Sequence, residues 1–191
     1  MKKLFALLLP CLFLLTACGE VAATAENIQT QYAQLSTADM AAKVTCHLSE
    51  ETRTYELTCT VTTDGTSTTV TAPEELAGIT TSVTPDGLTV TYDGTSLSAG
   101  DLYDVCPANC LPYLLNAVAD GYLIEQGTED FGGIPCYRMA LDTTAKSGEK
   151  VLCTVWIDEE TLIPRYAEFA QDDTVILTAE LTAFQCTVTE E

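Results

Sequence analysis

Apolar and polar residues alternate with a period of two over much of this chain, and this alternation constrains its fold more than any other feature. Residues 40–48 and 55–61 both show it, and a polar stretch over residues 49–53 separates them. Successive side chains of a strand point to opposite faces, so each run predicts a strand with one buried face. Two such runs joined by a polar turn predict a hairpin. The predicted antiparallel pairs are Val44/Val61, Cys46/Cys59 and Leu48/Leu57.

Further strands are predicted along the rest of the chain, and short turn signals separate many of them. These signals are Pro85-Asp86-Gly87, Gly132-Gly133, Ser147-Gly148 and Asp172-Asp173. Strands joined by short turns pair antiparallel. With the hairpin, the chain is predicted to have about ten strands. The others span residues 68–72, 79–83, 88–92, 122–126, 134–141, 151–157, 163–169 and 174–184.

Two segments have helical spacing instead. In residues 25–35, Ile28, Tyr32 and Leu35 form one stripe, and in residues 111–121 the stripe is Leu111, Leu114, Leu115 and Val118. Pro112 suits a first helical turn, and Gly121 suits a helix end. A long interruption between strands, about residues 98–121, carries the second helix.

The fold class follows from these elements. An antiparallel sheet must bury one face, and two or three helices are its predicted cover. We expect an α+β, mainly β fold. No Pro/Ser-rich linker and no long repeat interrupts the chain, so residues 25–191 are predicted to form one domain.

The first residues predict an export signal. Lys2 and Lys3 precede a mostly apolar run over residues 4–17, which ends in Leu15-Thr16-Ala17 before Cys18. A secretory signal has a basic start, an apolar middle of about 7–15 residues and small residues before the cut. A membrane-spanning helix is the first alternative, but the run is shorter than the required length of about 20 residues.

The ending Leu15-Thr16-Ala17-Cys18 resembles the bacterial lipobox. This resemblance implies that a signal peptide of residues 1–17 is removed and that the Cys18 thiol carries a diacylglycerol. Residues 18–24 then form a lipidated tether, and the protein is anchored to the extracytoplasmic face of the cell membrane. An ordinary signal peptide, with Cys18 present by chance, is the second alternative.

Acidic residues dominate the charge. The chain has 8 basic and 28 acidic residues and a formal charge of −20. Removing residues 1–17 removes two lysines and no acid, so six basic residues face 28 acids and the charge becomes −22. Such a surface repels nucleic acid and anionic lipid headgroups, so no nucleic-acid partner is expected.

Nine cysteines are present. With the processing that the lipobox resemblance implies, Cys11 leaves with the signal and Cys18 carries lipid. Seven remain, so at least one is free or paired outside the chain. Possible disulfides are Cys46/Cys59 and Cys136/Cys153, and each pair fits two small buried thiols equally well. Cys106 and Cys110 have C-x₃-C spacing, which differs from zinc and thioredoxin-like motifs. They predict the entry to a helix, either disulfide-bonded or as free thiols.

Signals for catalysis are weak. His47 is the one histidine and alternates with Cys46, so it is predicted to face solvent, away from the apolar row. The acids at Asp158-Glu159-Glu160 and Asp172-Asp173 fall at predicted turns, where solvated acids are common. We therefore expect a protein that is not an enzyme and has no catalytic residue, no metal and no cofactor.

Three sequence strings and their order resemble the LolA/LolB-like lipoprotein-carrier superfamily, and most closely the LolA-like (GerS-like) lipoproteins of Gram-positive bacteria. The strings are residues 72–79 (APEELAGI), residues 88–94 (LTVTYDG) and residues 156–164 (WIDEETLIP). The resemblance covers roughly residues 25–185. It implies a curved, unclosed antiparallel β-barrel with helices across its open side.

In that superfamily, the space between barrel and helices is a hydrophobic cavity for acyl chains. The resemblance thus implies a lipoprotein that binds an apolar ligand or a lipoprotein acyl chain. The alternative is a non-catalytic partner-binding or regulatory module of envelope or peptidoglycan processing. An ordinary packed core produces the same apolar rows. The candidate cavity residues are Tyr55, Leu57, Val61, Val70, Val83, Leu88, Val90, Tyr92, Leu111, Leu114, Leu115 and Val118.

Overall fold

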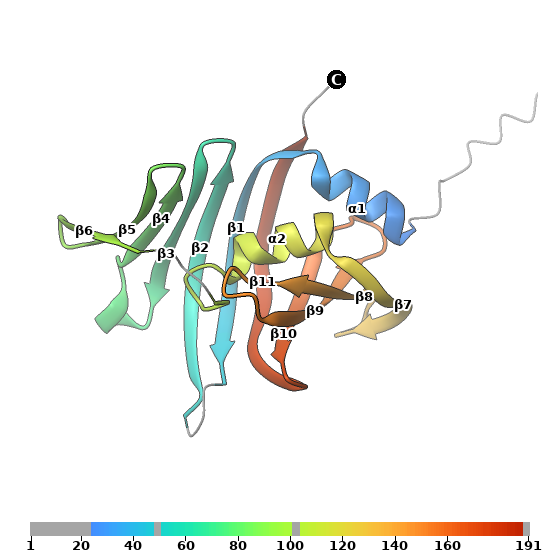
Figure 1. Ribbon diagram of the computed structural model, residues 1–191. Helices are drawn as coiled ribbons and strands as arrows, with labels where there is room; N and C mark the ends of the chain where they lie inside the picture. The colour runs from blue at the N-terminus through green and yellow to red at the C-terminus, as the bar shows by residue number, and fades with distance from the viewer. Residues whose placement is uncertain (1–23, 48–50, 101–103, 189–191) are drawn as a thin grey trace, which may run out of the picture.

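The computed structural model describes residues 24–47, 51–100 and 104–188. These residues form eleven strands in one sheet, two α-helices and one short 3-10 helix (Figure 1). The helices are α1 (Ala25–Ala33), α2 (Cys110–Asp120) and η1 (Glu74–Leu76). The strands are β1 (Leu35–Cys46), β2 (Arg53–Thr62), β3 (Gly65–Ala72), β4 (Thr80–Thr84), β5 (Gly87–Tyr92), β6 (Thr95–Ala99), β7 (Tyr122–Phe131), β8 (Ile134–Thr144), β9 (Lys150–Asp158), β10 (Pro164–Gln171) and β11 (Thr174–Val188).

The predicted signal peptide, residues 1–17, and the predicted lipidation site Cys18 lie outside the described residues, as do residues 19–23 of the predicted tether. Thr24, the last residue of that tether, is the N-cap of α1. Its hydroxyl oxygen accepts a hydrogen bond from the Asn27 N–H at 3.3 Å. A threonine in this position satisfies an otherwise unpaired N–H group and stabilises the start of the helix.

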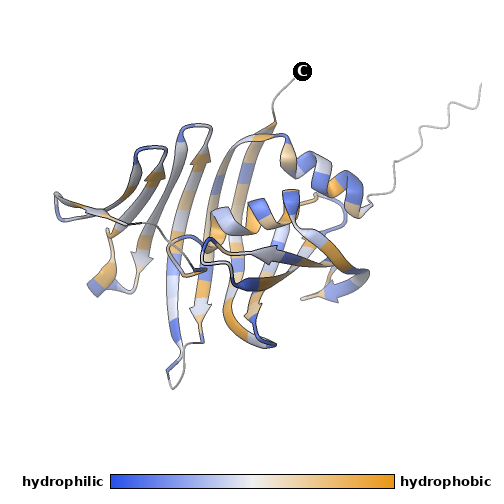
Figure 2. Ribbon diagram, in the orientation of Figure 1, coloured by the Kyte–Doolittle hydropathy of each residue, from blue (hydrophilic) through white to orange (hydrophobic). Residues whose placement is uncertain are grey.

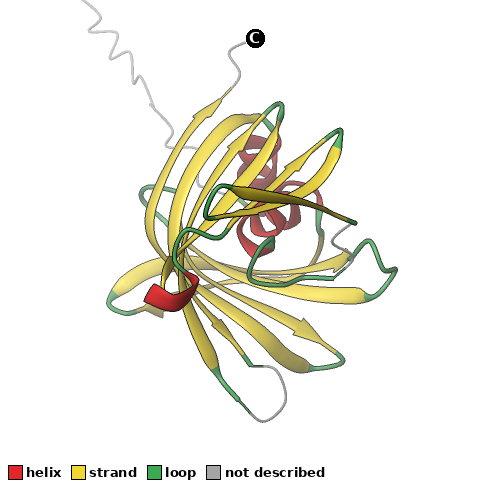
Figure 3. Ribbon diagram, turned by 90° about the vertical axis from the view of Figure 1, so that its left-hand side faces the viewer, coloured by secondary structure: helices red, strands yellow, loops and turns green. Residues whose placement is uncertain are grey.

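All neighbouring strands are antiparallel, in the order β6-β5-β4-β3-β2-β1-β11-β10-β9-β8-β7. The pairing of β1 with β11 joins the N-terminal and C-terminal halves of the sheet. β6 and β7 are the two edges, and the sheet curves around the helices without closing (Figure 3). The prediction of a mainly β, curved and unclosed antiparallel barrel is confirmed.

β6 is the one strand of the sheet that was not predicted from the sequence. Leu97 is its one large apolar residue and stands between Ser96 and Ser98, so period-two alternation is too short to be recognised. β6 pairs with β5, and this pairing places Leu97 opposite Val90. The predicted interruption from about residue 98 therefore begins later than expected, after this edge strand.

One continuous hydrophobic core lies between the concave face of the sheet and the two helices. In β1 the side chains of Met40, Ala42 and Val44 are buried, whereas Asp39 and Lys43 are exposed. Figure 2 shows this alternation of hydrophobic and hydrophilic residues along the long strands. α2 contacts α1, β2, β8 and β9, whereas β4, β5 and β6 extend beyond the helices on the left of Figure 1.

The register of the first hairpin differs from the prediction. Cys59 lies opposite Met40, and Cys46 lies opposite Arg53, so the predicted pairs Cys46/Cys59 and Val44/Val61 are wrong. Leu48 lies outside the described residues. The observed register is shifted by an even number of residues, which keeps every apolar residue on the same face. Hydrophobic alternation therefore cannot distinguish the two registers, and the length of the turn decides between them.

This register separates Cys46 from Cys59 by six residues along the ladder, or about 20 Å at the usual strand rise. Both are free thiols, and so are Cys136 and Cys153. In the β8–β9 ladder, Cys153 lies opposite Leu141 and Cys136 lies opposite Asp158. Five residues separate the two positions along the ladder, an odd number, so Cys136 and Cys153 lie on opposite faces of the sheet. Neither predicted disulfide is present.

Candidate functional site

Most of the predicted cavity residues pack into the core beneath α2. Leu111 and Leu114 on α2 have no exposed surface, and Leu57 on β2 is almost fully buried. Five members of the predicted set are buried in one hydrophobic cluster, namely Leu57, Leu111, Leu114, Leu115 and Val118. Its partly buried members, which pack against that cluster, are Tyr55, Val61 and Val70.

The other four predicted residues lie on the part of the sheet beyond α2. Val83 on β4 is opposite Leu88 on β5, so the two share one face, and the β5 residues Val90 and Tyr92 continue along that face. Leu97 on β6 extends the same face to the sheet edge. Leu88 is buried, but 49% of Tyr92 and 66% of Leu97 are exposed. An apolar row therefore becomes progressively more exposed toward the edge.

A pocket of about 470 Å³, here called the hairpin groove, lies where the β4–β5 hairpin meets α2. Its volume falls in the range of pockets that bind small molecules. Of the predicted cavity residues, Val83 and Leu88 line it. Its other lining residues have no pattern in the sequence that marks them as a site, and they are Thr66, Thr84, Pro85, Gly87, Asp104, Asn109, Pro112, Tyr113, Asn116 and Lys146.

A second pocket of about 500 Å³, here called the flank pocket, lies along the C-terminal half of α2. It shares Tyr113, Asn116 and Lys146 with the hairpin groove. The two pockets thus meet at these three side chains. The remaining residues of the flank pocket are mostly polar and comprise Ala117, Asp120, Gly121, Tyr122, Asp142, Thr143 and Thr144.

Tyr113 is held rigidly at this junction. Its hydroxyl lies 2.6 Å from the Thr143 hydroxyl, which itself donates to the carbonyl of Val151 at 2.9 Å. Because Thr143 has one hydroxyl proton, Tyr113 must be the donor in their shared bond. The Tyr113 ring packs edge-on against Phe169, with centroids 6.0 Å apart. These contacts fix the wall that separates the hairpin groove from the flank pocket.

The ends of α2 position its lining residues. Asn109 precedes the helix; its side-chain oxygen accepts from the Cys106 N–H at 2.8 Å, and its amide donates to the Asp104 carbonyl at 2.9 Å. At the other end, a Cβ at Gly121 would approach the Ala117 carbonyl oxygen to 2.4 Å. Glycine is therefore required where the chain turns from α2 into β7. The helix predicted over residues 111–121, with Pro112 in its first turn and Gly121 at its end, agrees with the observed helix to within one residue at each end.

Cys106 and Cys110 form the predicted entry to α2, and both are free thiols. The Cys110 N–H donates to the Cys106 carbonyl at 3.0 Å, and the Cys110 side chain is fully buried. Burial raises the pKa of the Cys110 thiol, since the thiolate would lose its hydration. A thiol in this state is a poor nucleophile.

His47 is exposed, as predicted from its alternation with buried Cys46. Within residues 24–47, 51–100 and 104–188, no group of three or more His, Cys, Asp or Glu side chains is arranged to hold a metal ion. No helix in this part of the chain is both long enough and apolar enough to cross a membrane.

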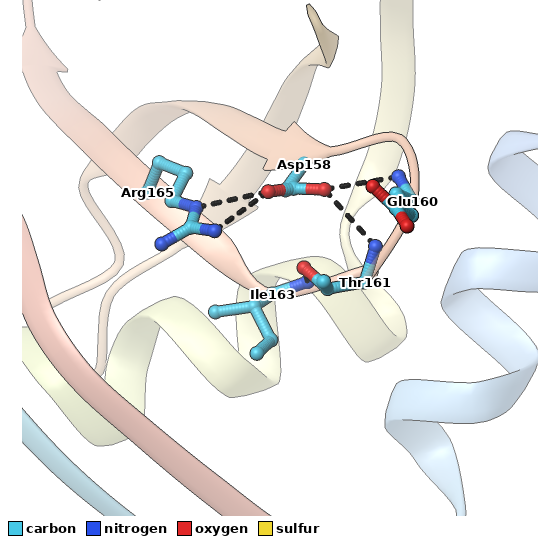
Figure 4. Close-up of polar contacts among 5 residues, drawn as sticks. All are labelled: Asp158, Glu160, Thr161, Ile163 and Arg165. Atoms are coloured by element: carbon cyan, nitrogen blue, oxygen red, sulfur yellow. Dashed lines mark hydrogen bonds and ion pairs between the residues drawn. The ribbon is translucent and has the colours of Figure 1, made fainter. Parts of the chain in front are cut away.

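Asp158 differs from its predicted solvated state, since only 8% of its side chain is exposed. It closes the turn between β9 and β10 (Figure 4). One carboxylate oxygen accepts from the N–H groups of Glu160 and Thr161, and the other accepts from Arg165. Burial raises the pKa of Asp158, but these hydrogen bonds outweigh burial and lower the pKa to about 2. Each carboxylate oxygen already accepts two hydrogen bonds, so Asp158 has a structural role and offers no acceptor to a ligand.

The same turn is attached to α1. The Tyr32 hydroxyl donates to the Leu162 carbonyl at 2.8 Å, and burial raises the Tyr32 pKa. Trp156, the first residue of the W-x-D string, lies on the outer face of the sheet and donates from Nε1 to Glu129 at 3.1 Å. Residues 156–164 therefore stabilise the β9–β10 hairpin and line neither the hairpin groove nor the flank pocket. The contacts of Asp158 with Arg165 and with the turn are here called the clamp.

Solved structures with a similar fold were found, although no protein-family model and no curated protein matches the chain. A DUF1329 family protein from Desulfovibrio piger is 13% identical, with a TM-score of 0.50, over 87% of this chain and 92% of that chain. The chain shares its fold. An uncharacterized conserved protein from Thermus thermophilus is 9% identical, with a TM-score of 0.53, over 88% of this chain and 90% of that one.

A LolA superfamily protein from Nitrosomonas europaea also matches, at 13% identity and a TM-score of 0.43, over 88% of this chain and 96% of that one. The architecture predicted from the LolA-like resemblance is confirmed by the strand order and the helices of the chain itself. The closer relation to lipoproteins of Gram-positive bacteria stays a prediction.

Proposed function

We propose that this chain is a non-enzymatic, membrane-anchored lipoprotein that binds an apolar ligand or a lipoprotein acyl chain in the hairpin groove. The observation that carries the proposal is the apolar row on β4, β5 and β6. It begins at buried Leu88 in the groove and ends at Leu97, which is 66% exposed. Large apolar side chains gathered on one exposed face commonly mark a site for a partner or ligand.

The proposed site is the open end of the barrel, in place of the space beneath α2. Leu111, Leu114 and Val118 leave no exposed surface there. An acyl chain entering beneath α2 would have to displace this packed core, whereas along Val90 and Tyr92 it would cover surface that is already accessible. Burying apolar surface contributes about 25 cal/mol per Å².

The proposed anchor gives the site a fixed location. In this proposal residues 1–17 are removed, Cys18 carries the lipid, residues 18–24 form the tether and residues 25–191 form the domain. Six residue steps separate Cys18 from Thr24, which an extended chain spans in about 20 Å. A domain held so close to the extracytoplasmic face cannot diffuse as a shuttle, so it would act as a fixed acceptor or local helper.

A second candidate function is a partner-binding or regulatory module of the envelope. The filled core beneath α2 favours it, because a scaffold needs no internal cavity. The edge strand β6 favours it as well, since none of its residues is charged and an uncharged edge is open to strand addition.

Native mass spectrometry of the full chain, purified from its membrane, tests the proposal. We expect a covalent lipid mass, which an exchange of Cys18 for Ala removes, and a second, non-covalent mass of lipid size. Val83→Asp should reduce the non-covalent mass, while Ser82→Asp, on the opposite face of β4, should leave it unchanged. A non-covalent mass that survives Val83→Asp would contradict the groove. A stoichiometric protein partner with no lipid would favour the second function.

A further inference from the structure

We propose that the ligand of the hairpin groove is a long-chain carboxylate whose head is bound by Lys146 and Asn116. This inference rests on the proposed function and assigns the chemical class of the ligand. It follows from the charges, the hydrogen-bond donors and the apolar surface that meet at the junction of the hairpin groove with the flank pocket.

The first observation concerns cations. Six basic residues remain once Lys2 and Lys3 are set aside, and all six are among the described residues. Four have a carboxylate partner, and these pairs are Arg53–Glu51, Arg138–Glu125, Lys150–Asp142 and Arg165–Asp158, at 2.9, 3.3, 3.7 and 2.6 Å. Within the described residues, Lys43 and Lys146 have no carboxylate within 4.0 Å. Lys146 is the member of this pair that lines a pocket.

The second observation is that the backbone holding Lys146 is fixed. The preceding residue, Ala145, is buried in the core, and its N–H donates to the Glu149 carbonyl at 2.8 Å. The Gly148 N–H donates back to the Ala145 carbonyl at 2.9 Å. The turn between β8 and β9 therefore fixes the backbone of Lys146, and its exposed side chain lines both pockets together with Tyr113 and Asn116 of α2.

The third observation concerns donors at the junction. The Tyr113 hydroxyl proton is used in its bond to Thr143, so Tyr113 offers no proton to a ligand. The Lys146 ammonium and the Asn116 amide are the donors that remain among the three shared side chains. Two donor groups suit the two oxygens of a carboxylate, and hydrogen bonds to an ionised acceptor are stronger than neutral ones.

Three acids line the two pockets, and none of their carboxylates lies within 4.0 Å of the Lys146 ammonium. Asp104 lines the far end of the hairpin groove with Asn109, which lies seven residues before Asn116 and so about 10 Å away along the helix. In the flank pocket, Asp142 is paired with Lys150 at 3.7 Å. Asp120 also lines the flank pocket, about 6 Å beyond Asn116 along the helix, and does not line the hairpin groove. The formal charge of −20 belongs to the whole chain, and at physiological salt it is screened beyond about 8 Å. The side chains at the junction of the two pockets therefore determine which ligand head group is bound.

The apolar row provides a place for the tail. From the junction, the groove leads over Val83 and Leu88 onto Val90, Tyr92 and Leu97. A ligand with a charged head at Lys146 and an unbranched apolar tail would cover the exposed surface of this row. A single-chain carboxylate satisfies both ends, whereas an uncharged apolar ligand leaves Lys146 without a partner.

Photocrosslinking of the full chain in neutral phosphatidylcholine nanodiscs tests this inference. The probe is hexadecanoic acid carrying a diazirine near its chain end, and the comparison probe is the alcohol of the same chain. We expect the acid to label residues 83–97 more strongly than the alcohol does. Lys146→Gln should reduce labelling by the acid about three- to fivefold, as for the loss of an exposed ion pair. Labelling by the alcohol should not change.

Lys43→Gln is the matched control, because it removes the other unpaired lysine, which is exposed on β1 between Glu56 and Glu180 of the neighbouring strands. It should leave labelling by both probes unchanged. Equal labelling by acid and alcohol, or an equal loss in Lys146→Gln and Lys43→Gln, overturns the carboxylate inference while leaving the proposed function in place. Absence of labelling over residues 83–97 by either probe overturns both.

Discussion

The Arg165 guanidinium donates two hydrogen bonds to one carboxylate oxygen of Asp158, from Nη2 at 2.6 Å and from Nε at 3.2 Å. This bond joins the end of β9 to the start of β10, and the other carboxylate oxygen closes the turn between them. Through the bond from Tyr32 to Leu162, the same turn fixes α1 against the sheet. The clamp thus stabilises the covered half of the barrel, far along the sheet from β6.

Asp158→Asn should destabilise the fold. The substitution leaves Arg165 without its carboxylate and weakens the acceptor of two backbone N–H groups, so we expect a loss of about 2–3 kcal/mol in the free energy of unfolding. Urea denaturation measures it. Glu160→Gln is the control in the same turn: the Glu160 side chain is exposed, so a change within about 0.5 kcal/mol is expected. An equal loss in both variants would contradict the clamp.

The clamp also predicts a pH dependence. The folded-state pKa of Asp158, about 2, is below its ordinary value of 3.8. A depressed pKa stabilises the fold at pH above the unfolded value, and this stability is lost as pH falls toward the folded value. The difference in unfolding free energy between the wild type and Asp158→Asn should therefore be constant from pH 7 to about pH 5 and shrink by about 2 kcal/mol toward pH 2. A constant difference over that range would contradict this assignment.

Much of the fold could be predicted because its signals are local. The α1 and α2 stripes, the turn residues and the strand alternation each depend on near neighbours in the chain. The hairpin register could not be predicted in this way. When the cross-strand partner of Cys46 changes from Cys59 to Arg53, the same residues of both strands stay on the buried face. Asp158 shows a similar limit. A turn acid is usually solvated, and its burial depends on Arg165, seven residues away across the turn.

The candidate site was predictable only in part. Period two identified Val83, Leu88, Val90 and Tyr92 as one face, but the same signal also selected Leu57, which lies in the packed core. Alternation reports which side a residue faces, and coverage by α2 determines whether that side is filled or open. Asn116 and Lys146 were missed because polar residues on an exposed helix face and in a turn have no distinguishing local pattern.

The cysteines should react in an order set by burial. Cys186 is exposed, whereas Cys110, Cys136 and Cys153 have no exposed surface, and burial raises the pKa of the Cys153 thiol to about 12. Under native conditions at pH 8, iodoacetamide should modify Cys186 first. The three buried thiols should react only after unfolding in urea. Peptide mass spectrometry under non-reducing conditions measures both results, and a linked Cys46–Cys59 peptide would contradict the observed register.

Leu114→Ala should lower stability strongly. Leu114 is fully buried against the sheet, and replacing a core leucine by alanine costs about 2–5 kcal/mol. The control on the exposed side of α2 is Asn116→Ala, for which the free energy of unfolding should change by less than about 0.5 kcal/mol. A small effect of Leu114→Ala would instead indicate a loosely filled space beneath α2 and would favour the cavity predicted there from the sequence.

Leu97→Asp should separate ligand binding from stability. Leu97 is 66% exposed at the edge of the sheet, so the free energy of unfolding should change by less than about 0.5 kcal/mol. Because its side chain shares the apolar face with Val90, the added charge should weaken binding of an apolar tail and reduce the non-covalent lipid mass. Ser98→Asp adds the same charge on the other face of β6, opposite Thr89, and should leave that mass unchanged. Equal losses in the two variants would show that charge alone, rather than the apolar row, controls binding.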